Sequence, residues 1–586
     1  MMNKVDMRKE EINKEEKKTE AERPEDGKAE VKKTEVKRPE DKKTEAGKED
    51  KRAEEKKKEE KKDEKKDEKK EKRYKKVVYS RGFTSIFWAL MQLFWFILMA
   101  VWASAQYPLL NNLLALFSLL FVIFLLNSRH EKMEYKTGWI IIVLLLPIFG
   151  VPFYIFYGDK KPGRRYRKRL KAAYLKYKDH HVQDPQVLED FRAEDERGAM
   201  TASYIMNEGK FPVYRNSDVT YYGQGEELFA SIMEGIREAE KFIFLEYFVI
   251  EQGDLWAEML EALLERARAG VEIRILYDDF GSVAYLPKNY WKKLEAMHPN
   301  IKCIKFNRVI PFFSWVMNNR DHRKMLIVDG KKAYTGGINL SDRYINLDSP
   351  YGHWKDAGVR VEGEAVWNFT LMYLEMWDAV KKDSRDTENI ELYRTDMSGF
   401  RAKEPLAFVQ PHGDEPFDDV WLSESIYLDM IVQTKKKLYI FTPYLIMSND
   451  LTDAISIAAK RGVDVRIVTP GIPDKKAVYR MTRTSYPELR RAGVKIYEYS
   501  PGFLHSKCML SDDKRACVGT VNFDYRSLFL HFEDGVYFEN SSAVAALSAD
   551  FDKTFPKCRE IQDGTIKRTA AGLIFDSILR VFAPLV

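Results

Sequence analysis

The sequence predicts an α/β fold in which two related βαβ repeats form one catalytic unit, preceded by N-terminal transmembrane helices and a disordered, charged tail. Three observations predict this organisation. Strand-like apolar runs alternate with amphipathic stretches in the C-terminal part of the chain, a long uncharged run precedes them, and a run of Lys and Glu comes first. With 586 residues, the chain has room for about two to four domains.

The tail, residues 1–76, is predicted to be disordered and cytoplasmic. It consists mostly of Lys and Glu, as in EEKKKEEKKDEKKDEKKEKR, and contains almost nothing apolar. Such a segment cannot bury enough surface to offset the loss of chain entropy on folding. A tether to an acidic surface is an alternative, but the two signs of charge nearly cancel, which favours a solvated tail.

A membrane segment is predicted over residues 82–158. No charged residue occurs from Gly82 to Ser128. One spanning helix needs about 20 apolar residues, so this run has room for a helical hairpin over 83–127. A polar, Pro-containing stretch at 104–112 marks the turn of that hairpin.

A second uncharged run, residues 137–158, is interrupted by Pro147, Gly150 and Pro152. Proline removes a helix hydrogen bond and clashes with the preceding turn, so we expect this run to kink or to reverse.

Basic residues flank the whole membrane segment, at 72–76 and at 160–169. The positive-inside rule places both flanks in the cytoplasm, which requires an even number of crossings. We expect two crossings of the cell membrane and a re-entrant third segment. Alternatively, the first segment lies in the interface and the other two cross. Residues 159–208 are predicted to be a basic juxtamembrane linker that leads to a cytoplasmic catalytic region.

The rest of the chain repeats itself, with a first repeat at 209–395 and a second at 396–586 that ends in a C-terminal helix. Each repeat has a strand-like run, an amphipathic stretch that ends near a Gly, and a second strand-like run. We expect βαβ units and a mostly parallel sheet. The matching runs are 241–247 and 269–275 in the first repeat, and 437–444 and 461–467 in the second.

Each repeat also carries the same signature of polar residues. The Lys lies two residues after the His, the Asp five after the Lys, the Gly seven after the Asp and the Asn three after the Gly. Because the pattern occurs twice, at equivalent points of a repeat, coincidence does not explain it. The two copies are His322, Lys324, Asp329, Gly336 and Asn339, and His505, Lys507, Asp512, Gly519 and Asn522.

These residue types suit chemistry on a phosphate group. Side chains two apart on a strand share a face, so each His and its Lys point the same way. Two lysines supply positive charge for phosphoryl oxygens, and Asn339 and Asn522 supply neutral donors as phosphate-binding residues. One imidazole can attack phosphorus while another, protonated, donates to the leaving oxygen. A single such His is usually structural, but a paired set indicates catalysis.

The paired motifs resemble those of the phospholipase D superfamily, and several other segments resemble bacterial cardiolipin synthases in particular. The resemblance covers nearly everything from Thr137 to the C-terminus, whereas the charged tail, an additional apolar segment and Thr520 depart from the family pattern. The cardiolipin synthase-like segments are 137–139, 246–250, 277–282, 319–324 and 580–586.

The resemblance implies an enzyme that needs no metal or cofactor and acts on membrane phospholipids, not on nucleic acid. His322 would be the nucleophile that forms a phosphohistidine, and His505 the acid that protonates the departing alcohol, although the two roles could be exchanged. The implied reaction transfers a phosphatidyl group between two phosphatidylglycerol molecules and yields cardiolipin and glycerol.

Two pairs of carboxylates are candidates to orient these histidines. Asp329 and Asp512 belong to the motifs, which makes them catalytic candidates. A residue five positions after the Lys lies on the opposite strand face, however, which favours a structural ion pair. Asp356 and Glu533 match the second carboxylate positions of the resembled family when the repeats are aligned, and they are the favoured histidine-orienting residues.

Other functions are less well supported. A hydrolase or a phosphatidyltransferase with another donor or acceptor shares the motifs, and so does a membrane-bound nuclease. The near-neutral net charge of +6 argues against a nuclease. Four scattered cysteines, without a Cys-x-x-Cys pair, predict no zinc site.

Two further apolar segments leave alternatives open. The loop at 310–317 either dips into the bilayer or packs in the core. The stretch at 573–582 has helical spacing and could dock on the protein or on a membrane, and docking on the protein is favoured.

Overall fold

A computed structural model of the chain provides the structure. The predicted tail, most of the first membrane segment and the 310–317 loop lie outside the residues that it describes. Apart from a few positions between 91 and 102, the described residues are 106–128, 132–146, 149–158, 164–308, 319–381, 386–418, 420–566 and 569–583.

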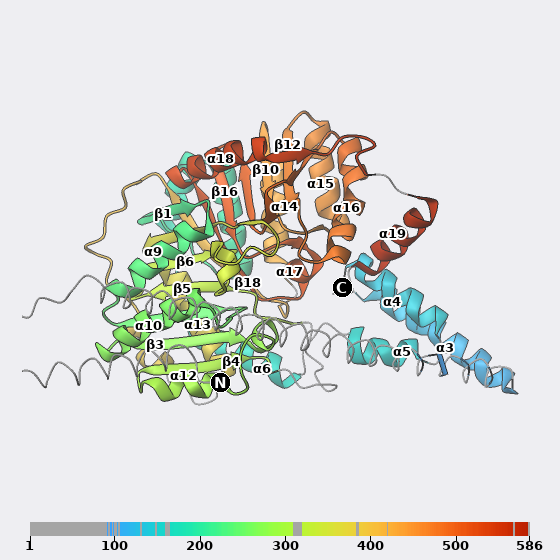
Figure 1. Cartoon of the computed structure of the whole chain (residues 1–586), viewed down its shortest axis with the longest axis horizontal. Helices are drawn as coiled ribbons and strands as arrows, with labels where there is room; N and C mark the ends of the chain where they lie inside the picture. The colour runs from blue at the N-terminus through green and yellow to red at the C-terminus, as the bar shows by residue number, and fades with distance from the viewer. Residues whose placement is uncertain are drawn as a thin grey trace, which may run out of the picture. The chain divides into compact units, whose positions relative to one another are not determined.

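The first repeat is built on a seven-stranded sheet, drawn in green and yellow in Figure 1. The strand order is β1-β8-β6-β5-β2-β3-β4. Most positions of its central strands are buried, and β2 and β5 are buried along their whole length. The strands are β1 Ser217–Tyr222, β2 Phe242–Tyr247, β3 Glu272–Asp278, β4 Ile301–Phe306, β5 Lys324–Val328, β6 Lys332–Gly336 and β8 Gly358–Gly363.

The second repeat has an eight-stranded sheet with the order β19-β13-β12-β10-β15-β16-β18-β9. Without β19, this order reproduces that of the first sheet strand for strand, so the internal repeat is a duplication of a whole sheet. The strands are β9 Phe408–Asp414, β10 Lys437–Phe441, β12 Asp464–Pro470, β13 Lys495–Tyr499, β15 Cys508–Ser511, β16 Arg515–Gly519, β18 Glu533–Glu539 and β19 Cys558–Glu560.

The expectation of a mostly parallel sheet is wrong. Only β2-β3 and β3-β4 are parallel in the first sheet, and only β10-β12 and β12-β13 in the second. The other pairs are antiparallel. In each repeat the chain follows its βαβ units with a tight hairpin, β5-β6 in the first repeat and β15-β16 in the second. Such short turns can connect only antiparallel strands.

Helices cover both sheets, and one helix of each repeat reaches across to the other. Each repeat places a helix against the first strand of the other repeat. Helix α13, which follows β8, contacts β9, and helix α18, which follows β18, contacts β1. The helices of the repeats are α9 Gly225–Glu238, α10 Asp254–Arg268, α11 Asp279–Ser282, α12 Tyr290–Met297, α13 Val366–Val380, α14 Leu422–Gln433, α15 Asn449–Lys460, α16 Lys476–Arg491, α17 Tyr525–Phe529, α18 Ser542–Thr554 and α19 Ala570–Phe582.

Upstream of the repeats, helix α3 (Pro108–Asn127) begins inside the predicted turn of the hairpin, and α4 (Met133–Leu145) follows it. The chain then breaks before α5 (Gly150–Phe153), near Pro147, as the prolines predict. A Cβ on Gly150 would lie 2.4 Å from the Cα of Val143, so α5 turns back onto α4. Among the described helices, none combines the length and the apolar character required to cross a bilayer, and the two crossings remain a prediction.

The segment predicted as a linker is helical, with α6 (Arg164–Tyr177), α7 (Pro185–Glu194) and α8 (Glu196–Tyr204). Helix α6 is basic in sequence, but Leu170, Ala173 and Tyr177 are buried along one side of it. The Tyr177 hydroxyl donates to Asp378 of α13 at 3.0 Å. Helix α6 therefore packs on the first repeat, whereas α8 contacts α14 of the second, where the Thr201 hydroxyl donates to Asp429.

Asp329 and Asp512 fix the hairpins of the two sheets. Asp329, in the left-handed region with φ 52°, accepts hydrogen bonds from the backbone N–H groups of residues 240–242 at 2.7–2.9 Å. Asp512 accepts the same three bonds from residues 435–437 at 2.7–3.0 Å. The partners of both carboxylates are backbone N–H groups and not the cations of the expected ion pairs.

We predict that Asp329→Ala lowers the free energy of unfolding by roughly 2–4 kcal/mol, because buried backbone donors lose a charged acceptor. The fall in Tm of the detergent-solubilised chain measures the effect, and Asp512→Ala should lower Tm by less, because two of its three backbone hydrogen bonds are exposed. The control is Asp552→Ala, at an exposed position of α18. Equal Tm values for Asp329→Ala and this control would contradict the assignment.

Candidate active site

The four His and Lys side chains of the motifs meet between the two sheets. Each pair lies at the start of a central strand, β5 or β15, and is buried. Only 8% of His322 and 7% of His505 remain exposed, and each Lys is 1% exposed. The charges of Lys507 and His505 act on His322, so both halves contribute to one site.

Backbone hydrogen bonds between the repeats hold both histidines. The short strands β7 (His353–Lys355) and β14 (Gly502–Leu504) pair in parallel, and the His505 N–H then donates to the Lys355 carbonyl at 2.7 Å. At the equivalent place in the other half, the His322 N–H donates to the Phe532 carbonyl at 2.9 Å. Each histidine is therefore anchored to the segment of the other repeat that carries a candidate carboxylate.

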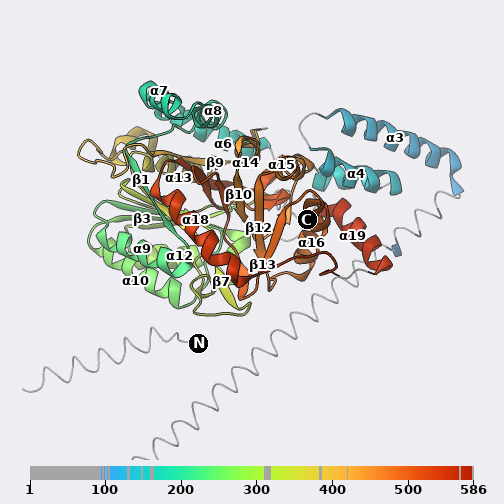
Figure 2. The ribbon, with the colours of Figure 1, turned by 90° about the horizontal axis from the view of Figure 1, so that it is seen from above.

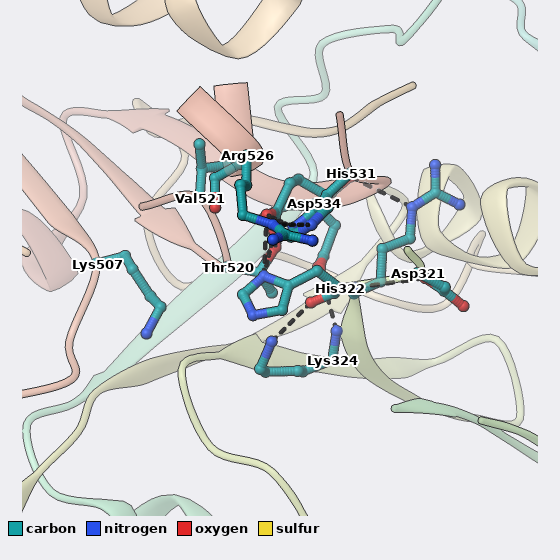
Figure 3. A network of polar contacts seen from close by, with 12 residues as sticks. Asp321, His322, Lys324, Lys507, Thr520, Val521, Arg526, His531 and Asp534 are labelled. Carbon is teal, nitrogen blue, oxygen red and sulfur yellow. Dashed lines mark hydrogen bonds and ion pairs between the residues drawn. The ribbon is translucent and has the colours of Figure 1, made fainter. Parts of the chain in front are cut away.

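The carboxylates consequently pair with the histidines in a crossed arrangement. His322 Nδ1 lies 2.9 Å from both carboxylate oxygens of Glu533, in the second repeat. Figure 3 shows His322 with the Lys324 side chain beside it. His505 Nδ1 lies 2.7 Å from Asp356 Oδ2, in the first. Both carboxylates are fully buried. Because Nδ1 is held in each ring, chemistry falls to Nε2.

Further donors hold the two carboxylates in place. The Thr520 hydroxyl donates to Glu533 Oε2 at 2.6 Å, and the Trp354 indole N–H donates to Asp356 Oδ2 at 3.4 Å. Thr520 departs from the family pattern in sequence, and the structure gives it a function as a support for Glu533.

Burial and repulsion between positive groups lower the pKa values of the two histidines and the two lysines. Burial, followed by the positive charges of Lys324 and Lys507, holds the pKa of His322 well below its usual value. Burial and Lys507 lower the pKa of His505 to about 4, although Asp356 opposes this shift. Burial also lowers the pKa of Lys324 to about 8 and that of Lys507 to about 7. A bound phosphodiester anion would reverse these shifts.

The two asparagines support the site from its edges. Asn339 Oδ1 accepts from the Val249 N–H at 3.0 Å, and its amide donates to the Tyr344 hydroxyl at 2.8 Å. The Tyr344 ring lies 5.5 Å from that of His505, centroid to centroid. Asn522 donates to the Asp524 carboxylate. Phosphate binding by either asparagine remains a prediction.

A buried charged cluster adjoins His322. Two of its members, Glu246 and Arg323, lie in the cardiolipin synthase-like segments, but the motif spacing does not predict their pairing. Arg323 donates to the Glu533 carbonyl at 3.2 Å and lies 3.7 Å from Glu246. Asp534 accepts from the Thr335 hydroxyl and from the Lys324 N–H, the latter at 3.3 Å. Burial raises the pKa of Asp534 to about 6.

One group of side chains has the composition of a metal site. The potential ligand atoms of His322, His531 and Glu533 all lie within 4.8 Å of one another. The His322 and His531 rings are 5.5 Å apart, and His531 occupies the position of Trp354 in the other repeat. The hydrogen bonds from His322 to Glu533 account for the proximity of these two residues, and His531 Nδ1 lies 3.7 Å from Glu533 Oε1.

Comparison with known proteins agrees with this geometry. Residues 232–352 and 427–555 match the family model described as cardiolipin synthase, PLD-like domain, and residues 112–158 match the one described as phospholipase D-nuclease N-terminal. An uncharacterised protein of Streptococcus mutans is 38% identical over 465 residues, which cover 79% of this chain and 99% of that protein.

Two named relatives have similar coverage. Cardiolipin synthase 2 of Bacillus anthracis is 32% identical over 478 residues, 79% of this chain and 88% of that protein. A cardiolipin synthase of Geobacillus kaustophilus is 32% identical over 491 residues, 81% of this chain and 95% of that protein.

The two repeats, with one His-Lys pair each around a shared site, define a phospholipase D-like enzyme of the phosphatidyltransferase class. Within that class, the chain belongs to the cardiolipin synthase family.

We predict that Glu533→Gln and Asp356→Asn each lower kcat by roughly 10²–10⁴-fold, because an amide no longer holds the working tautomer of the histidine. Steady-state kinetics with a check of Tm separates this effect from unfolding. The matched control is Asp512→Asn, which lies in the motif but whose carboxylate accepts from the backbone N–H groups of residues 435–437 and not from a histidine. A kcat that is unchanged in both site variants would refute the orienting role.

The lysines predict a pH dependence. Each is charged below its pKa, so the pair loses positive charge as the pH rises through about 7 for Lys507 and about 8 for Lys324. We expect kcat/KM of the free enzyme to fall over that interval, because phosphate binding requires the ammonium form. A profile that stays level until about pH 10, where an ordinary lysine titrates, would contradict the prediction.

Proposed function

We propose that this enzyme is a cardiolipin synthase that transfers a phosphatidyl group from one phosphatidylglycerol to the terminal glycerol hydroxyl of a second. The products are cardiolipin and glycerol. One observation carries the proposal: two buried histidines, each held at Nδ1 by a carboxylate of the other repeat, flanked by two buried lysines. Family membership supports the choice of lipids.

In the first step, His322 Nε2 attacks phosphorus and the bond from phosphorus to the glycerol oxygen breaks. His505 donates a proton to that oxygen, and glycerol leaves. In the second step, neutral His505 accepts the proton of the incoming hydroxyl, whose oxygen displaces His322 from phosphorus. One phosphodiester replaces another, so no external energy source or redox partner is required. The lysines balance the charge on the phosphoryl oxygens in both transition states.

His505 has to carry a proton when the donor lipid is bound. Its pKa of about 4 belongs to the unoccupied site, where burial and Lys507 disfavour a further positive charge. A phosphodiester anion adds a negative charge next to the ring and removes part of the repulsion, so substrate binding and protonation of His505 favour each other. The buried Asp356 carboxylate then stabilises the imidazolium form.

The proposal includes a location in the cell membrane, with two crossings and a cytoplasmic catalytic region. The family match at 112–158, the exposed apolar side chains of α3 and the basic flanks at 72–76 and 160–169 support it. Proximity to the bilayer also suits the chemistry, because both substrates and the larger product are lipids.

The detergent-solubilised enzyme with phosphatidylglycerol and a chelator tests the reaction. We expect cardiolipin and glycerol in equal amounts, with no product from His322→Ala. Phosphatidic acid without cardiolipin would replace the transferase with a hydrolase. Absence of any product, with product appearing when phosphatidylethanolamine is added, would replace the donor.

The two-step reaction also predicts which histidine becomes phosphorylated. With labelled phosphatidylglycerol and rapid, acid-free quenching during turnover, the unaltered enzyme should carry a phosphatidyl adduct on His322, and His505→Ala should carry less, because it lacks the acid that protonates the departing glycerol. Mass spectrometry of the peptide that contains His322 detects it. An adduct at His505 in the His322→Ala variant, and none at His322, would exchange the two roles.

A further inference from the structure

The C-terminal helix α19 packs on the protein through charged side chains and exposes its apolar ones. Its only buried residue is Asp576, whose carboxylate accepts from Arg480 of α16 at 2.6 Å. One turn later in α19, Arg580 donates to Glu488 of α16, also at 2.6 Å. A helix docked on a soluble core would bury its apolar residues and expose its charges.

The apolar side chains of α19 face outward instead. They are Leu573, Ile574, Phe575 and Ile578, which are between 49% and 65% exposed. With about 100° per residue, Ile574, Phe575 and Ile578 centre on the side opposite Asp576 and Arg580. Four large apolar residues on one short helix form a patch that normally marks an interaction surface.

The contacts of α19 fix this orientation. Thr569 caps its first turn by accepting from the Gly572 N–H at 3.1 Å. Arg480 also donates to the Gly572 carbonyl at 3.2 Å and lies over the Phe575 ring at 4.6 Å from its centroid. Bonds on the polar side thus hold the helix with its apolar side outward.

The surroundings of α19 identify what covers the apolar side. The helix contacts α4, which belongs to the segment that matches the N-terminal family model, and both figures show the two helices side by side (Figures 1 and 2). Leu144 and Leu145 of α4 are 51% and 72% exposed, and α3 exposes further large apolar residues, such as Leu109 at 75%. The apolar surface therefore continues from α19 into the predicted membrane segment.

We propose that α19 is an interfacial membrane helix whose face with Ile574, Phe575 and Ile578 lies in the phospholipid bilayer next to α3 and α4. Its polar side remains bound to α16, so the helix connects the second repeat to the membrane surface. An amphipathic helix in the interface buries its apolar face in the region where headgroups meet acyl chains. The sequence favours docking of residues 573–582 on the protein. In this proposal, only the polar side of the helix docks on the protein, and the apolar side contacts the bilayer.

The position of α19 matters because a cavity of about 360 Å³ lies behind it. Its lining comes from α4, α15, α16 and α19, together with Ile446 and with Tyr525 of α17. Tyr525 follows Asn522 by three residues, and Ile446 lies in β11 (Leu445–Ile446), which pairs with β17 (Phe523–Asp524). Insertion of α19 would place this cavity beside the bilayer, at the side of the second repeat that leads to the motif.

Site-directed labelling of the full chain in nanodiscs tests the proposal without relying on activity. A fluorophore is attached at Ile574→Cys in a Cys558→Ser background, since the other three cysteines are buried. The control position is Ile457→Cys on α15, where the native side chain is 59% exposed, against 65% for Ile574. The nanodiscs contain phosphatidylglycerol and phosphatidylcholine, with or without bromine on the acyl chains.

Bromine should quench the label at Ile574→Cys roughly twofold or more, because the helix face reaches the acyl region, and should leave the label at Ile457→Cys unchanged. Equal quenching at both positions would overturn the proposal.

A kinetic comparison adds a functional readout that rests on the proposed reaction. Ile574→Asn with Ile578→Asn should raise the apparent KM for phosphatidylglycerol in vesicles severalfold at unchanged kcat, whereas Ile457→Asn should not. An unaltered KM with a normal Tm would refute the contribution of α19 to lipid access. If phosphatidylglycerol proves not to be the donor, only the kinetic comparison fails, and the labelling experiment still decides the membrane contact.

Discussion

The active site depends on one constraint: neither repeat can orient its own histidine. His322 relies on Glu533 and His505 on Asp356, and each pair joins residues from different repeats. The backbone links from Phe532 to His322 and from Lys355 to His505 impose this exchange. Misalignment of the two sheets would therefore remove both Nδ1 contacts at once. The exchange of helices α13 and α18 between the repeats resists such a shift, because each binds the first strand of the other sheet.

The same arrangement explains how two lysines and two histidines tolerate burial in one place. Isolated buried cations are costly, and each needs a nearby anion or a bond to remain charged. Here the two buried carboxylates face the histidines, while each lysine ammonium donates to the carbonyl of its own histidine. The compensation is incomplete, as the lowered pKa values of Lys324 and Lys507 indicate. The site therefore keeps a net positive potential. A phosphodiester anion can neutralise it, so the charges are arranged in advance for such a substrate.

The sequence predicts the parts of this site that depend on local spacing. The spacing of two residues between His and Lys identifies the histidines and lysines. Alignment of the repeats on Val359 and Val536 identifies Asp356 and Glu533. The crossing between repeats was not predictable, because spacing along one chain does not say which of two equivalent segments lies next to a given strand. The antiparallel hairpins were missed because apolar runs look alike in either direction. The charges of α6 concealed the buried stripe at Leu170, Ala173 and Tyr177.

The two halves are alike in topology but not in chemistry, and the difference bears on which histidine becomes covalently bound. Arg323 and Asp321 flank His322, whereas Ser506 and Leu504 stand at the matching positions beside His505. Glu533 contacts His322 through both oxygens and is held by Thr520, and the His322 ring lies 5.0 Å from that of Phe248. His505 faces a carboxylate held by an indole, and it sits among the rings of Trp354, Tyr344 and Phe503. A nucleophile must keep one orientation throughout both steps, while a proton shuttle must change its charge twice. In the proposed reaction, the contact of both Glu533 oxygens with His322 suits the first task, and the single contact of Asp356 with His505 suits the second.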